Sequence, residues 1–174
     1  NVYSRYTNPS VRAFEERLAS LEGAEAAVGT ASGMSAILST AMALLKSGDH
    51  VVCSRDVFGT TTNLFGKYMA KFGVEVSTVP LLDAEGWRKA MKSNTTMLFL
   101  ETPSNPLWDV ADIEAAAVLA KVAGARVVVD NTVPTPVLTR PLALGADLVM
   151  HSATKYLNGH SDVLAGVLVT AGTD

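Results

Sequence analysis

Lys155 is the residue of this sequence that is best placed for covalent chemistry. It lies in the segment His-Ser-Ala-Thr-Lys-Tyr, where the hydroxyl groups of Ser152 and Thr154 can donate to a phosphate. A lysine that is buried beside a cation has a lowered amine pKa and forms Schiff bases with carbonyl compounds. A lysine after a strand is otherwise an ordinary solvated charge. The neighbouring hydroxyls favour a covalent site for a phosphorylated carbonyl compound.

Asp130 is a second candidate, because it closes the apolar run Arg-Val-Val-Val. A carboxylate in that place caps a helix, forms a salt bridge, or faces a cationic heterocycle. A pyridinium nitrogen stays protonated beside an ionised partner, and an aspartate in that role recurs in sites for pyridoxal phosphate. Asp130 and Lys155 together therefore suggest such a cofactor.

Ser32, Gly33 and Met34 stand where an expected strand passes into an expected helix. The first turn of a helix offers free N–H groups to an anion, and a glycine there lets a phosphate approach the backbone closely. The segment fits neither the dinucleotide-binding fingerprint nor the nucleotide P-loop. It predicts a phosphate site of another kind.

Short apolar runs alternate along the chain with longer segments of helical period. Strands are expected at residues 26–30, 50–54, 74–79, 97–101, 126–130, 148–151 and 163–169. Helices are expected at 9–22, 33–46, 60–72, 84–92 and 113–123, the first with Asn8 as its N-cap and Gly23 at its end. This alternation predicts an α/β fold with a mostly parallel sheet and helices on both faces. The candidate residues then follow the carboxyl ends of strands, where such sheets bind ligands.

Composition narrows the function classes. The chain has 174 residues, 48% of them hydrophobic, and a formal net charge of -3, which gives no basic surface for nucleic acid. No apolar run reaches the roughly 18 residues of a membrane span, and Cys53 is the only cysteine, so the cytoplasm is the expected compartment. The histidines lack metal-ligand spacing, so no metal site is expected. Glu101 ends a strand without an evident acid partner, and we expect a structural role for it.

Five motifs appear in an order that resembles the Cys/Met-metabolism family of pyridoxal-phosphate enzymes. The family includes cystathionine γ-synthase, cystathionine lyases, methionine γ-lyase and homoserine-ester sulfhydrylases. The resemblance extends from Tyr3 to Val169 and implies the aminotransferase-like large domain of fold-type I enzymes, with a seven-stranded sheet. The motifs are Tyr3-Ser4-Arg5 with Asn8-Pro9, Ser32-Gly33-Met34, Glu101 to Pro106, Val129 to Thr132, and Ser152 to Tyr156.

The resemblance implies roles for the residues around the cofactor ring. Lys155 matches the lysine that forms the Schiff base and then shuttles protons. Asp130 matches the partner of the pyridine nitrogen, and Asn105 matches the group near the phenolic oxygen. Phe58 stands where most of the family has a tyrosine that stacks on the ring.

Other matched positions surround the cofactor phosphate. The resemblance implies backbone donors at Gly33 and Met34, beside Ser32, and hydroxyl donors at Ser152 and Thr154. Tyr3 and Arg5 match residues that reach into a neighbouring subunit and bind its phosphate, and the guanidinium fork of arginine suits that role. A homodimer or homotetramer with shared active sites is therefore expected.

Phe58 also bears on the reaction, because it lacks the phenol that protonates a leaving group. A thiolate, with a thiol pKa of about 8.5, leaves poorly without an acid, whereas a carboxylate near about 4 leaves unaided. We therefore expect γ-replacement on O-succinyl- or O-acetylhomoserine by a sulfur nucleophile, in methionine and cysteine biosynthesis. Residues 158–162 instead resemble the wider γ-synthase and lyase set, so a cystathionine or methionine lyase is the alternative.

More distant alternatives are another fold-type I enzyme such as an aminotransferase, a nucleotide-binding module, and a dimerisation scaffold. Family members are about twice as long as this chain. Residues 1–174 are therefore expected to be part of the cofactor-binding large domain, without the start of the N-terminal arm and without the C-terminal small domain. Such a fragment is expected to be inactive alone.

Overall fold

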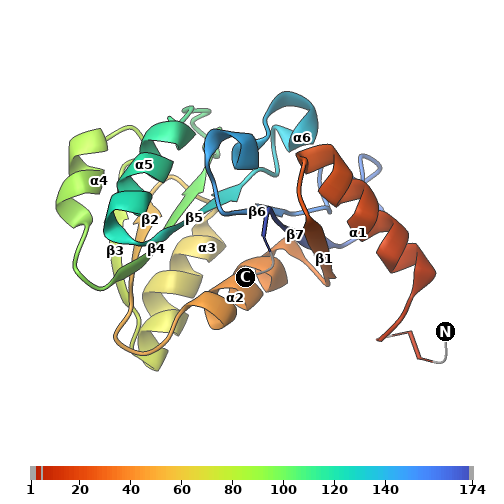
Figure 1. The fold of residues 1–174 in the computed structure, drawn as a ribbon, viewed down its shortest axis with the longest axis horizontal. Helices are drawn as coiled ribbons and strands as arrows, with labels where there is room; N and C mark the ends of the chain where they lie inside the picture. Colours follow the sequence, from red (N-terminus) through yellow and green to blue (C-terminus); the bar gives the residue numbers. More distant parts are fainter. Residues whose placement is uncertain (1–2, 5, 173–174) are drawn as a thin grey trace.

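A computed structural model describes residues 3–4 and 6–172, so Arg5 lies outside the described residues. Its centre is one seven-stranded sheet in the order β1-β7-β6-β5-β4-β2-β3 (Figure 1). β7 runs antiparallel to both of its neighbours, and the other neighbouring strands are parallel. The strands are β1 Ala26–Thr30, β2 His50–Ser54, β3 Glu75–Val79, β4 Thr95–Glu101, β5 Arg126–Asp130, β6 Leu148–His151 and β7 Gly166–Thr170.

Helices cover both faces of this sheet (Figure 1). One face packs against α2 and the segment from α3 to η2, and the other packs against α1, α4 and α5. The helices are α1 Pro9–Glu22, α2 Gly33–Leu44, α3 Gly59–Asn63, η1 Leu64–Tyr68, η2 Met69–Phe72, α4 Ala84–Ala90, α5 Ile113–Ala123, α6 Thr135–Leu138 and η3 Pro141–Leu144. The predicted α/β class with a mostly parallel sheet is confirmed.

Local signals set the ends of α1 where the sequence predicts them. The Asn8 side chain accepts hydrogen bonds from the amides of Ser10 and Val11. Gly23 ends the helix in the left-handed region at φ 71°, which a residue with a Cβ adopts less readily. Glu22 lies in the last turn of this helix and is buried against the sheet.

Two predicted elements were wrong in part. The expected helix at 60–72 is a short α-helix that continues as the π-helical turn η1 and the 3-10 turn η2. Consecutive threonines and Gly66 give this segment weak helix propensity. The expected strand at 163–169 begins three residues late, because Thr154 takes both the N–H and the C=O of Ala165 before β7 can pair.

No helix in the described part of the chain combines the length and the apolar character needed to cross a membrane.

Candidate active site

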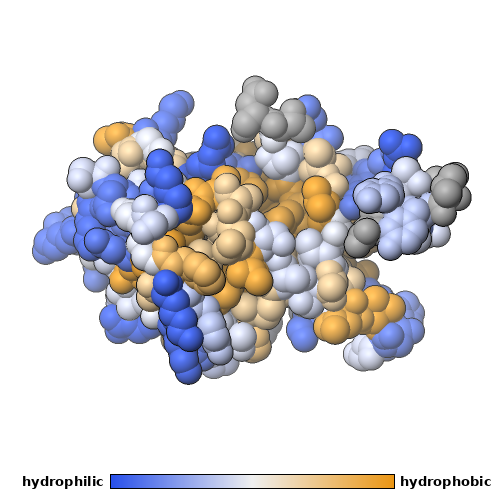
Figure 2. All heavy atoms as spheres, turned by 90° about the horizontal axis from the view of Figure 1, so that it is seen from below, coloured by the Kyte–Doolittle hydropathy of each residue, from blue (hydrophilic) through white to orange (hydrophobic). Residues whose placement is uncertain are grey.

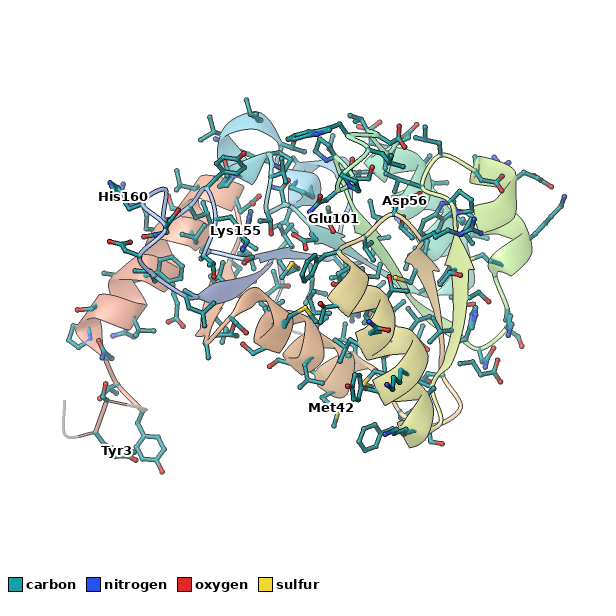
Figure 3. The ribbon with its side chains drawn as sticks, turned by 180° about the vertical axis from the view of Figure 1, so that it is seen from behind. Tyr3, Met42, Asp56, Glu101, Lys155 and His160 are labelled. Atoms are coloured by element: carbon teal, nitrogen blue, oxygen red, sulfur yellow. The ribbon has the colours of Figure 1, made fainter. Side chains whose placement is uncertain are left out.

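The carboxyl ends of β2, β4, β5 and β6 meet at one edge of the sheet because these neighbouring strands are parallel. Figure 3 shows Asp56, Glu101 and Lys155 in a row along this edge, with Met42 on the opposite, lower side of the molecule. Asp130 and Met150 are partners in the β5–β6 register, and Lys155 follows in the turn after β6. The fold therefore brings the two central candidates to adjacent strand ends.

Asp130 is buried, with 7% of its surface exposed. Its Oδ1 accepts two hydrogen bonds from Thr132, one from the amide at 3.0 Å and one from the hydroxyl at 2.5 Å. Burial raises the pKa of this carboxyl, and the Thr132 bonds and the charge of His151 act in the opposite direction. In the described part of the chain Oδ2 has no partner. Asp130 thus presents one carboxylate oxygen for a cationic group.

Glu101 lies beside Asp130, as its partner in the β4–β5 register. Its Oε2 accepts a 2.7 Å hydrogen bond from the amide of Phe58, the residue before α3. Burial, and next the charge of Asp130, raise the pKa of Glu101 to about 7. This pair could not be predicted from the sequence, because strand register rather than sequence spacing brings the two carboxyls together. Glu101 thus holds the backbone of Phe58 in place. The Phe58 side chain is half-exposed.

Replacing Glu101 with glutamine is expected to flatten the dependence of stability on pH. The folded chain holds a proton on Glu101 up to about pH 7, whereas a glutamate with the ordinary pKa of 4.5 loses it earlier. Protonation therefore favours the fold: this stabilisation is complete below about pH 4.5 and is lost as the pH rises towards 7. At about 1.4 kcal/mol per pKa unit, Glu101 accounts for at most about 3.5 kcal/mol between those limits.

Urea unfolding of the full chain at pH 5 and pH 8 measures this change. The Glu101→Gln chain should lose less free energy of unfolding between the two pH values than the wild type. Glu114→Gln, at an exposed position in the first turn of α5, is the control and should behave as wild type. An unchanged pH dependence in Glu101→Gln would contradict the assignment.

The N-terminus of α2 has the features of an anion site. Ser32 is its N-cap and forms a capping box with Ser35, which satisfies the Ser32 and Ser35 amides. Among the described residues the amides of Gly33 and Met34 find no acceptor, as expected in a first helical turn. A Cβ on Gly33 would lie 2.8 Å from the Cβ and 3.0 Å from the Cα of Ser152. A glycine at position 33 is therefore needed for Ser152, the residue after β6, to lie this close to the amides of Gly33 and Met34.

Replacing Gly33 with alanine is expected to force α2 and Ser152 apart. An overpacked methyl group costs typically about 1–3 kcal/mol, which should lower the free energy of unfolding of the full chain in urea. Gly59→Ala is a matched control, since Gly59 also opens a helix and its Cβ would meet nothing within 4 Å. Equal stabilities of the two variants would contradict the close approach.

Lys155 and its hydroxyl neighbours differ in what they contact. Lys155 is exposed and lies in the turn after β6, where its carbonyl accepts from the amide of Gly159. Ser152 lies against Gly33. The hydroxyl of Thr154 donates to the carbonyl of Ala165 and accepts from its amide, both at 3.1 Å. Its single proton is therefore committed to the backbone before β7, so Ser152 is the better hydroxyl donor for a phosphate.

The remaining predicted residues are Asn105, Tyr3 and Arg5. Asn105 is exposed in the loop after β4. Tyr3 is half-exposed, its ring is tilted against that of Tyr6 with the centroids 5.3 Å apart, and it lies far from Lys155 (Figure 3). Arg5 lies outside the described residues. The site of one chain is therefore assembled from strand ends and from α2.

The residues present fit pyridoxal phosphate. An anionic oxygen of Asp130 suits a pyridinium nitrogen, and the Gly33 and Met34 amides beside Ser152 suit a phosphate. Lys155, on the strand end next to Asp130, suits the aldehyde. The fit includes one feature that sequence reasoning did not find, the two hydrogen bonds from Thr132 that orient Asp130.

A buried hydrogen-bonded cluster lies behind the site, on the opposite face of the strand ends. Glu22 Oε1 contacts His151 Nε2 at 2.6 Å and accepts from Asn131 Nδ2 at 3.1 Å. All three residues are at most 1% exposed. This contact gives His151 a structural role, and its partner could not be inferred from the sequence, because Glu22 lies at the other end of the chain.

Comparisons with known proteins give one consistent result. The whole chain, residues 1–174, matches the family model described as "Cys/Met metabolism PLP-dependent enzyme". The chain is 56% identical over 172 residues to O-succinylhomoserine sulfhydrylase of Pseudomonas aeruginosa, covering 99% of this chain and 43% of that protein. It is 46% identical over 170 residues to an L-methionine gamma-lyase of Fusobacterium nucleatum subsp. polymorphum, with 97% and 43% covered.

A cystathionine gamma-lyase of Bacillus subtilis is 45% identical over 172 residues, with 99% of this chain and 45% of the relative covered. In structure, the chain superimposes on metB from Corynebacterium glutamicum with a TM-score of 0.95 and 42% identity. The match covers 98% of this chain and 44% of that one. The chain thus spans less than half the length of these relatives.

Proposed function

The chain belongs to the Cys/Met metabolism family of enzymes that depend on pyridoxal phosphate, and on that basis we propose that it forms part of an enzyme for γ-replacement. The substrate is an O-acylated homoserine, O-succinyl- or O-acetylhomoserine, and the attacking group is a sulfur nucleophile. The product is a sulfur amino acid of the methionine and cysteine pathways.

Phe58 is the observation that carries this choice. Its amide donates to Glu101, the register partner of Asp130, which supports a phenyl ring rather than a phenol next to the site. Without a phenol, the leaving group must depart as a stable anion, and a carboxylate does so with a conjugate-acid pKa near about 4. The similarity to an O-succinylhomoserine sulfhydrylase supports the same choice.

The roles proposed for the chain's own residues follow from their positions. When bound, pyridoxal phosphate supplies an electron-withdrawing ring that stabilises negative charge at the substrate Cα. Lys155 holds the cofactor covalently and, once released, removes and returns protons as a general base and acid. Asp130 keeps the ring nitrogen protonated. The amides of Gly33 and Met34, with Ser152, bind the phosphate, and Phe58 stacks on the ring.

Assembly and location complete the proposal. Tyr3 lies away from the site of its own chain, which supports a dimer or tetramer in which Tyr3 and Arg5 reach a neighbouring subunit. The one cysteine, Cys53, is buried and free, and burial raises its pKa to about 12, which supports a structural thiol in a reducing cytoplasm.

Product analysis tests the reaction. The complete enzyme of which this chain forms part, supplied with pyridoxal phosphate, should consume O-succinyl- or O-acetylhomoserine in the presence of sulfide or cysteine. It should leave cystathionine and methionine largely intact. Rapid cleavage of either thioether without use of the esters would overturn the proposal in favour of a γ-lyase.

The lyase is the second candidate, since relatives with 45–46% identity are named methionine and cystathionine gamma-lyases.

A further inference from the structure

We propose that Thr132 is a positioning residue, whose hydroxyl orients the Asp130 carboxylate towards the ring nitrogen and couples it to the Ser152 backbone beside the phosphate site. This inference rests on the proposed function, because only a bound pyridoxal phosphate gives the Asp130 carboxylate a ring nitrogen to contact. Thr132 itself contacts neither substrate nor cofactor in the proposal.

The Thr132 hydroxyl lies between two groups of the site. It donates to Asp130 Oδ1 at 2.5 Å and accepts from the amide of Ser152 at 2.8 Å. A hydroxyl has one proton, so the bond to the carboxylate fixes its direction and leaves a lone pair for the amide. Ser152 in turn lies against Gly33 at the N-terminus of α2. The Thr132 hydroxyl oxygen therefore connects Asp130, at the end of β5, to Ser152, which lies beside the proposed phosphate site at Gly33.

Both bonds to Asp130 end on the same oxygen. The amide of Thr132 also donates to Oδ1, at 3.0 Å, so the carboxylate cannot rotate without losing two bonds. Oδ2 is thereby left for the cofactor. Bonds that donate to a carboxylate favour its ionised form, and they lower a pKa that burial raises.

The backbone on each side of this connection is held from behind the sheet. Asn131 precedes Thr132 and His151 precedes Ser152, and the same buried carboxylate, Glu22, contacts both side chains. Asn131 also donates to the carbonyl of Thr139 at 2.8 Å, and its amide donates to the carbonyl of Met150 at 2.9 Å. Movement of Thr132 away from Ser152 would break this cluster, so the hydroxyl keeps its two partners.

The experiment compares Thr132→Val with Thr132→Ser in the full chain. Valine keeps the shape and removes the hydroxyl, whereas serine keeps the hydroxyl. The readout is the dissociation constant of pyridoxal phosphate, from fluorescence titration at pH 6, 7 and 8.5. Valine should weaken binding about tenfold or more at pH 6, as expected for loss of a bond to a charged group, and serine should restore tight binding.

The dependence of the dissociation constant on pH separates an effect on the orientation and charge of Asp130 from simple damage to the fold. Without the hydroxyl, Asp130 takes up a proton more readily, so the loss relative to wild type should be largest at pH 6 and smaller at pH 8.5. Glu101 and His151, which also act on Asp130, are the same in wild type and variants, so each loss is taken against the wild type at the same pH. Thr78→Val, on the exposed edge strand β3, is the matched control and should bind as wild type at each pH. In an Asp130→Asn background, Thr132→Val should cause little further loss, because the partner is already neutral.

Each outcome decides the matter. Equal dissociation constants for the valine and serine variants, or a loss for valine that is the same at all pH values, would overturn the inference and leave the proposed function intact. If Thr132→Val does not fold, Thr132→Ala is measured in its place against the same criteria. A wild-type chain that binds no pyridoxal phosphate would overturn the proposed function, and this inference with it.

Discussion

In the complete enzyme of which this chain forms part, Lys155→Ala is expected to abolish turnover of every amino-acid substrate, by at least about ten-thousandfold. One side chain is proposed to hold the cofactor covalently and to transfer protons at the substrate, and a single general acid–base group alone contributes up to about 10⁴. The visible absorbance of the Schiff base should disappear in the same variant, because no other lysine follows the strand end next to Asp130 in the described part of the chain.

Two controls make this result specific. Lys155→Arg keeps the positive charge but supplies no nucleophilic amine, so it should also lose the absorbance. Lys121→Ala, exposed in the last turn of α5, should keep both absorbance and turnover. Borohydride reduction of the wild type, followed by peptide mass analysis, should locate the cofactor on Lys155. A reduced cofactor on any other lysine would contradict the assignment.

Much of the fold was predictable because local chemistry encodes it. Asn8 and Gly23 set the ends of α1 through a side-chain cap and a left-handed residue. The apolar runs that end at Ser54, Glu101 and Asp130 gave three buried parallel strands with the correct ends. The order of the motifs predicted the family, which the family model confirms.

The features that the sequence did not reveal depend on contacts between residues that are distant in sequence. Thr154 looks like a phosphate donor in the sequence, but in the structure its hydroxyl bonds Ala165 and delays β7. Glu101 looks isolated until the β4–β5 register sets it beside Asp130. Glu22 gives no signal of its contact with His151, because a long separation along the chain leaves no periodic pattern.

These long-range contacts explain why the site needs the whole sheet. Asp130 is flanked by Glu101 on β4 and by Thr132, and Thr132 is held in turn by Ser152 after β6. The sheet edge therefore buries two carboxyls side by side, an arrangement that raises the pKa of Glu101 to about 7. Such an arrangement lowers stability and is understandable where a function requires the charge.

Replacing Asp130 with asparagine is expected to separate stability from activity. Asparagine keeps the shape and can still accept the Thr132 bonds, but it carries no charge to hold the ring nitrogen protonated. Turnover of the O-acylated homoserine should fall about a thousandfold, which corresponds to about 4 kcal/mol of barrier at 1.36 kcal/mol per factor of ten.

Stability should change in the opposite direction. Burial raises the pKa of Asp130, which means that the fold disfavours its charge. A neutral isostere removes that penalty, so the cofactor-free Asp130→Asn chain should be at least as stable as wild type in urea at pH 8. Its advantage should shrink as the pH falls, because the wild-type carboxyl then takes up a proton in the folded state. An activity loss accompanied by lower stability at pH 8 would instead indicate damage to the strand ends, and the electron-sink role of Asp130 would lose its support.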